Sequence, residues 1–175
     1  AYVLVCQPHP KKGGFIYTRE ALLDIHERSH RSLIKLLEYC RQFSADEINR
    51  EFTGFGYPTL RLLFYHTIGA EQYWTGVLQG HFDAEDADSL YPTTESLQKY
   101  CQDVSAITEG YLHSASPEEL NTPRKMITDP NQERILAPAL VIMRIQTHIY
   151  HHQGQILAIC RLLGKPAERM DFPII

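Results

Sequence analysis

Residues 138–164 read PALVIMRIQTHIYHHQGQILAICRLLG and carry a clear helical pattern. Proline suits the first turn of a helix, where a backbone N–H would have no partner, so Pro138 marks a start. Glycine after the last apolar position marks an end at Gly164. Between these residues the apolar side chains recur every three or four positions, at Val141, Ile145, Ile156, Ile159 and Leu163. This spacing predicts one long helix with a buried face.

The same helical period occurs in three earlier segments. We expect helices over residues 18–43, 58–80 and 93–111, because each joins a capping residue or an initial proline to an apolar stripe. Ser44 and Glu47 form a capping box, which predicts a short helical turn. Between Asn121 and Ile135 the period disappears, which predicts a small hairpin or an irregular excursion. The predicted fold is all-α, an antiparallel four-helix bundle with a long, partly extended connection before the last helix.

Length and composition are those of one ordinary domain. The chain has 175 residues, a net charge of −4 and a pI near 6.1. We expect an N-terminal arm over residues 1–17 and the bundle domain over residues 18–175. The charge argues against a nucleic-acid partner, since phosphate binding needs a basic surface. The longest apolar run, residues 137–143, is far shorter than the roughly 20 residues of a membrane span. With no signal-peptide pattern at the start either, we expect a cytoplasmic protein without a membrane partner.

Two histidines, His148 and His152, stand four residues apart on the face of the last helix that also carries Ile145 and Ile156. Such a pair has Cβ atoms about 6 Å apart, so both imidazoles can reach one ion. Core histidines held by hydrogen bonds would show the same spacing, which leaves both interpretations open. His66, beside the apolar stripe of the second helix, adds a third imidazole. Three protein ligands with an open fourth position are typical of catalytic metal sites, so we predict a divalent metal on this set.

The other candidate residues give weaker signals. His151 lies about 100° around the helix from His152, so it is expected on another face or beside a metal ligand without binding the ion itself. The histidines expected in loops or on the surface are His9, His81 and His113. The four cysteines lack C-x-x-C spacing, and Cys40 and Cys160 fall in apolar helical patterns, so we expect these two in the core.

Glu27 and His30 form the Glu-x-x-His element of di-iron bundles. The last helix offers no glutamate before Glu168 to complete a second element, which argues against a di-iron oxidase. No Gly-x-Ser-x-Gly elbow is present, so nucleophilic catalysis by a protein side chain is not indicated either.

Residues 63–74, LFYHTIGAEQYW, resemble the second-helix signature of the DinB/YfiT family. Residues 148–156, HIYHHQGQI, resemble its H-x-x-x-H-R-G-Q signature, and a leucine turn before Gly164 and a late aspartate, Asp171, follow as in the family. The resemblance extends over residues 18–171. Two positions depart from it: Gln153 stands where the family usually has arginine, and Arg144 stands where many members carry a further histidine. These departures bear on contacts to an anionic substrate.

The resemblance implies an up-down-down-up or related four-helix bundle, often a homodimer. It also implies a zinc- or nickel-type ion on the residues that match His66, His148 and His152. Some members of the family are thiol S-transferases that use low-molecular-weight thiols such as bacillithiol or mycothiol. Others are described as metal-dependent hydrolases, isomerases or stress-induced proteins.

Three functions therefore compete. The first is thiol S-transfer to a small-molecule substrate, because an open position on the metal can bind a thiol and lower its pKa. The second is hydrolysis by a metal-bound water, with a nearby carboxylate or histidine as base. The third is non-catalytic, with the metal stabilising a binding or stress-response protein. An open, partly apolar mouth with Tyr65, Tyr150 or Trp74 at its rim would favour an enzyme, and a sealed metal would favour a structural role.

Overall fold

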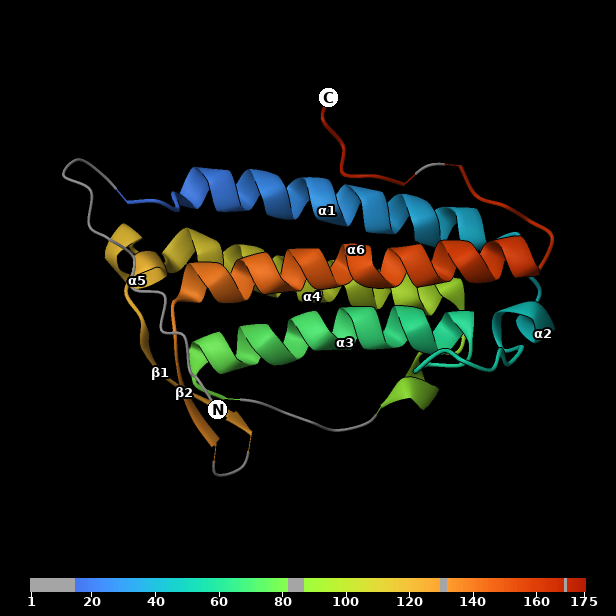
Figure 1. The fold of residues 1–175 in the computed structure, drawn as a ribbon, viewed down its shortest axis with the longest axis horizontal. Coiled ribbons are helices and arrows are strands. Elements are labelled where there is room, and N and C mark those ends of the chain that lie inside the picture. The colour runs from blue at the N-terminus through green and yellow to red at the C-terminus, as the bar shows by residue number, and fades with distance from the viewer. Residues whose placement is uncertain (1–14, 82–86, 130–131, 169) are drawn as a thin grey trace.

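The computed structural model describes residues 15–81, 87–129, 132–168 and 170–175 (Figure 1). Most of the arm predicted over residues 1–17 lies outside these ranges. The described chain is mostly helical, as predicted, with four long helices, α1 (Arg19–Cys40), α3 (Leu60–Gln79), α4 (Thr94–Ser114) and α6 (Pro138–Leu162). The shorter elements are α2 (Ala45–Ile48), the 3-10 turn η1 (Asp88–Leu90), α5 (Pro117–Asn121), β1 (Arg124–Asp129) and β2 (Gln132–Leu136). Among the described residues, none of these helices combines the length and the apolar character needed to cross a membrane.

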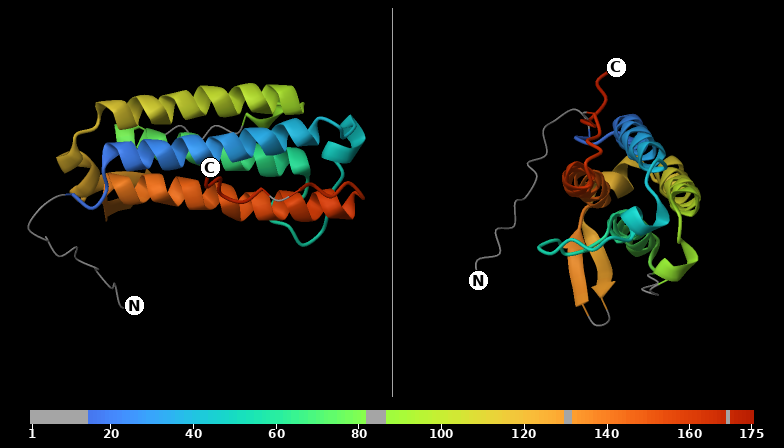
Figure 2. Two further views of the ribbon diagram at one scale, coloured as in Figure 1. Left: turned by 90° about the horizontal axis from the view of Figure 1, so that it is seen from above. Right: turned by 90° about the vertical axis from the view of Figure 1, so that its right-hand side faces the viewer.

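The four long helices pack around one core. α1 and α3 each pack against both α4 and α6, so α1 and α3 lie at opposite corners, as the end-on view in Figure 2 shows. The colour gradient in Figure 1 shows that α1 and α6 run in one direction and α3 and α4 in the other. Arg61, near the start of α3, donates to the carboxylate of Asp88 at 2.7 Å, so η1 lies near the start of α3. The directions are therefore up, down, down and up in chain order.

Side-chain caps set the starts of three long helices. The hydroxyls of Thr18, Thr59 and Thr93 accept backbone N–H groups of the following turn. The predicted capping box of Ser44 and Glu47 is present and opens α2. The second long helix begins after Thr59 instead of at the predicted Pro58, because the threonine supplies the cap.

The hairpin predicted before the last helix is confirmed. β1 and β2 pair antiparallel, with Arg124 opposite Leu136 and an irregularity between Ile127 and Asp129. Met126 is 3% exposed, and β1 packs against α3. One face of this short sheet therefore covers the end of the helical core.

The core contains apolar side chains from all four long helices, and Cys40 and Cys160 are fully buried as predicted. At two positions an isoleucine that fits the helical apolar spacing is less buried than the polar residue that follows it. Ile107 is 46% exposed, and its neighbour Thr108 faces inward. Ile25 is half-buried, whereas His26 is buried. Apolar spacing selects the isoleucines, but the polar neighbours find hydrogen-bond partners inside and can take the inward positions.

Candidate metal centre

His66 on α3 and His148 and His152 on α6 converge where these two antiparallel helices pack together. One ring nitrogen from each lies within 4.8 Å of the other two. The Nε2 atoms of His66 and His148 are 3.2 Å apart. Nitrogens bound at about 2.0–2.1 Å to a tetrahedral ion lie about 3.4 Å apart, so the spacing of the three imidazoles suits one ion. The residues predicted from the sequence are thus brought together.

The three imidazoles are neutral, which is the form that binds a metal. Burial, reinforced by the neighbouring His152, lowers the pKa of His66 to about 4. Burial and the same neighbour lower the pKa of His148 to about 4 as well. The pKa of His152 is also lowered, chiefly by burial. Near neutral pH the lone pairs of all three rings are therefore available to a cation.

Gln155 fixes the orientation of His152. The Nδ1–H of His152 donates to Oε1 of Gln155 at 2.7 Å, one turn further along α6. This hydrogen bond places the proton on Nδ1 and leaves Nε2 free for a metal. Gln155 is not among the residues predicted for the site, although residues three apart on a helix are neighbours, so its spacing from His152 is a signal for this contact.

Tyr57, in the loop before α3, covers one face of His66. The two rings stack with centroids 3.9 Å apart, and the Tyr57 ring also lies edge-on to His152 at 6.4 Å. This contact limits the rotation of the His66 imidazole. No periodicity marks a loop residue, so Tyr57 could not be predicted as a neighbour of the site.

The group of imidazoles lies at the surface of the helix pair. His66 and His148 are half-buried, and the adjacent His151 is exposed. Arg144, one turn before His148, is exposed and lies over the ring of Trp74 at 5.2 Å. A fourth ligand can therefore approach from solvent. Two surface hollows lie elsewhere, one lined by Arg19 and Pro117 and one by Lys35 and Met170, so the donor atoms and not the surface shape identify this site.

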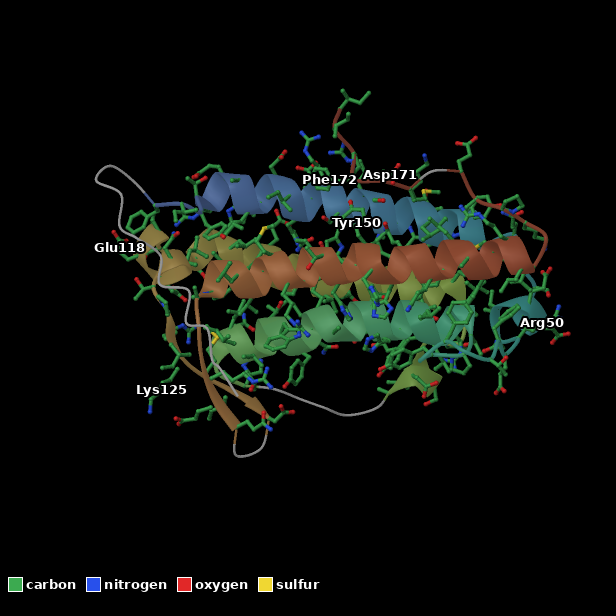
Figure 3. All side chains as sticks on the ribbon, viewed as in Figure 1. Arg50, Glu118, Lys125, Tyr150, Asp171 and Phe172 are labelled. Atoms are coloured by element: carbon green, nitrogen blue, oxygen red, sulfur yellow. The ribbon has the colours of Figure 1, made fainter. Side chains whose placement is uncertain are left out.

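Of the three aromatic residues whose presence at the rim would favour an enzyme, Tyr65 and Tyr150 lie elsewhere. Tyr65 stacks on Tyr91 and Tyr100, at centroid distances of 5.9 Å each. Tyr150 points toward the C-terminal segment and packs on Phe172 at 6.0 Å, as Figure 3 shows. Each is adjacent in sequence to a residue at or near the site, and a step of one or two residues turns a side chain to another face of the helix. Trp74 is the one that neighbours the site, through its contact with Arg144.

Gln153, where the sequence departs from the family signature, is part of the contact between α6 and α1. Gln153 is 1% exposed and lies against α1, 3.3 Å from the hydroxyl of Ser32. Ser32 in turn donates to the backbone carbonyl of Met170. The amide of Gln153 therefore helps to join α6 and α1, on a face of α6 turned away from His66.

Glu27 and His30, the Glu-x-x-His pair on α1, lie on different faces of the helix. Glu27 is exposed and pairs with Arg31 at 2.9 Å, whereas His30 points into the core and meets Glu71 at 2.8 Å. The two residues thus cannot serve one metal, which agrees with the argument against a di-iron oxidase. The histidines expected at the surface, His81 and His113, are exposed, and His9 lies outside the described residues.

Comparison with known proteins identifies structures with a similar fold and the family of the chain. A crystal structure of a DinB-like protein from Bacillus cereus ATCC 10987 matches with a TM-score of 0.67 and 18% identity, covering 86% of this chain and 97% of that one. A conserved protein from Enterococcus faecalis matches with a TM-score of 0.62 and 16% identity, covering 86% and 99%. No curated protein matches in sequence. The sequence model of the DinB family matches residues 23–175. The chain therefore belongs to the DinB family.

Proposed function

We propose that this protein is a metal-dependent enzyme that transfers a low-molecular-weight thiol to an electrophilic small molecule. His66, His148 and His152 would hold one zinc- or nickel-type ion within an up-down-down-up four-helix bundle. The observation that carries the proposal is the convergence of three neutral imidazoles at a solvent-facing edge, where a fourth ligand can enter. A structural ion would instead be enclosed by four protein ligands.

A divalent cation held there would lower the pKa of a bound thiol and keep it as the thiolate. The protein positions this chemistry through Gln155, which sets the tautomer of His152, and through Tyr57, which packs on His66. The thiolate would form a bond to an electrophilic carbon, the leaving group would depart with its electron pair, and the thiol proton would pass to water.

Arg144 offers a positive charge beside the open side of the site. It is close enough to His148 to contribute to the lowering of that residue's pKa, and Trp74 supports its guanidinium. An anionic group on the thiol or on the electrophile would be attracted to it. The charge of Arg144 therefore suits a thiol that carries an anionic group, such as a carboxylate, better than an uncharged thiol.

One observation favours hydrolysis as a second candidate. The exposed ring of His151 lies next to His152, with centroids 4.8 Å apart. An imidazole in this place can accept a proton from water near the open position. A screen for the protein's activity therefore needs hydrolysable esters and amides beside thiol and electrophile pairs.

The decisive experiment compares the untagged protein with His66→Ala and with His113→Ala, which removes an exposed histidine elsewhere. After zinc or nickel loading and dialysis, His66→Ala should hold one ion fewer per chain than the other two proteins. Thiol transfer should be lost with that ion. Equal metal contents would remove the basis of the proposal. Loss of the ion together with loss of folding, and no turnover in the wild type, would favour the non-catalytic alternative.

We also propose that the protein forms a homodimer, as the family resemblance suggests. Light scattering of the purified protein tests this directly, and a monomeric mass at micromolar concentration would contradict it.

A further inference from the structure

A second cluster of titratable side chains lies in the core. His26 and His30 from α1 and Glu71 from α3 are 3%, 7% and 1% exposed. One potential ligand atom from each lies within 4.8 Å of the other two. None of these residues belongs to the site of His66, and the proposed transfer reaction does not use them.

Part of this cluster is satisfied as it stands. Nε2 of His30 lies 2.8 Å from Oε2 of Glu71, and its Nδ1 lies 3.5 Å from the thiol of Cys101. Oε1 of Glu71 accepts the hydroxyl proton of Thr108 at 2.7 Å. A proton on His30 thus balances the carboxylate charge when no other cation is present.

The rest of the cluster is less completely hydrogen-bonded. Nε2 of His26 lies 3.2 Å from the backbone carbonyl and 3.1 Å from the hydroxyl of Ser105, and a proton on Nε2 leaves the lone pair on Nδ1. Nδ1 accepts from the amide Nε2–H of Gln146 at 3.3 Å and lies 3.8 Å from Oε1 of Glu71. Gln146 is 2% exposed, and its Oε1 has no hydrogen-bond partner. A buried acceptor without a partner is costly, and a cation bound by Oε1 of Gln146 would remove that cost.

We propose that His26, His30 and Glu71 bind a second divalent cation, of the zinc type. Two histidines and a carboxylate are an established zinc donor set, and Gln146 would supply a fourth oxygen once its amide turns over. The outer nitrogens of both rings already have the contacts that metal-bound histidines use, a backbone carbonyl for His26 and the Cys101 thiol for His30. When the ion enters, the Nε2 proton of His30 leaves to solvent.

The expected role of this ion is structural. All four of its ligands are buried, so no position faces solvent for a substrate. The ligands join α1 to α3, which lie at opposite corners, and Gln146 adds α6. The ion would therefore fasten three of the four long helices at one point inside the core.

Zinc stoichiometry of the full chain tests this proposal separately from the proposed function. The wild type, loaded with zinc alone and dialysed against a weak chelator, should hold two ions per chain. The variant His148→Ala with His152→Ala should keep one ion, and adding Glu71→Gln should remove it. Glu27→Gln, which changes an exposed carboxylate on α1, is the matched control and should keep the wild-type content. A folded double variant that binds no zinc, or an ion that persists after Glu71→Gln, would overturn the proposal.

A second measurement covers the case in which Glu71→Gln does not fold. In the double histidine variant, the ring nitrogens of His26 and His30 should change their NMR chemical shifts when zinc is added, and the His113 ring should not. Unchanged shifts at His26 and His30 with zinc bound would place the ion elsewhere and reject the site.

Discussion

The phenol ring of Tyr57 stacks on the imidazole of His66, with centroids 3.9 Å apart and planes inclined by 19°. The two residues belong to different parts of the chain, since Tyr57 lies in the loop that follows α2 and His66 lies within α3. The contact therefore connects the position of a loop to the orientation of a proposed metal ligand. An imidazole held by a stacked ring loses less freedom when it binds an ion.

Replacement of this ring should weaken metal binding. Aromatic pairs contribute about 0.5–1.5 kcal/mol beyond their buried area, so Tyr57→Leu should raise the dissociation constant for zinc about 2- to 10-fold. Competition with a chromophoric chelator measures the change. Tyr57→Phe keeps the stack and should bind zinc like the wild type. If Tyr57→Phe loses as much affinity as Tyr57→Leu, the stacked ring is not what supports His66.

The hydrogen bond from His152 to Gln155 supports a second prediction. Removal of a partner that orients a metal ligand typically costs about 10- to 100-fold in affinity, so Gln155→Leu should weaken zinc binding by at least about tenfold. Gln155→Glu keeps an acceptor at the same place and should bind zinc at least as well as the wild type. Circular dichroism should show that both variants are folded. Equal affinities for both variants would mean that the tautomer of His152 does not depend on Gln155.

Much of this structure follows from local signals in the sequence. Helical spacing and caps predict the four long helices to within a few residues, because each apolar stripe agrees with the end signals around it. His148 and His152 could be paired from their spacing alone, since residues four apart share a helix face. His66 could be added from its place beside the apolar stripe of α3, and the family resemblance supports the same set, although the sequence does not state which face of α3 meets α6.

The remaining features depend on tertiary structure. Tyr57 reaches the site through a loop, whose path no periodicity describes. Glu71 is a carboxylate at an inward position of α3, and apolar patterning does not select such a residue. His26 and His30 show the same four-residue spacing as His148 and His152, so that signal was present. It was missed because Ile25 fits the apolar stripe better than His26 does.

Glu71 should be important for stability whether or not zinc is bound. Removing one member of a buried ion pair leaves the other charge uncompensated and typically costs about 3–5 kcal/mol, so Glu71→Gln should lower the free energy of unfolding by about that amount. Urea unfolding in the presence of a chelator measures this difference without metal. Glu27→Gln removes an exposed carboxylate and should change the free energy of unfolding by less than about 0.5 kcal/mol. Equal stability of Glu71→Gln and the wild type would show that the His30 and Glu71 pair contributes nothing net.

The same pair predicts how the stability of the metal-free protein depends on pH. Burial opposes a charge on His30, but the adjacent Glu71 outweighs it and raises the pKa of His30 to about 10 in the folded state. An unfolded histidine titrates near pH 6.5, so between about pH 6.5 and 10 the folded chain binds a proton that the unfolded chain does not. The stabilisation from His30 is thus complete below about pH 6.5 and is lost as the pH rises toward 10, at up to about 1.4 kcal/mol per pH unit.

Glu71 acts at the other end of the pH scale. Burial opposes its charge, but His30 and Thr108 outweigh that effect and lower its pKa, so its contribution is present above about pH 4.3 and is lost as the pH falls further.

Urea unfolding at pH 6, 8 and 9.5 with a chelator present tests the alkaline prediction for His30. The free energy of unfolding of the wild type should decline over this range. In His30→Gln the proton-binding group is absent, so the free energy of unfolding should change less between pH 6 and 9.5. If the free energies of unfolding of the wild type and His30→Gln have parallel pH profiles, His30 holds no proton in the folded core, and the Glu71 carboxylate lacks its expected counter-charge.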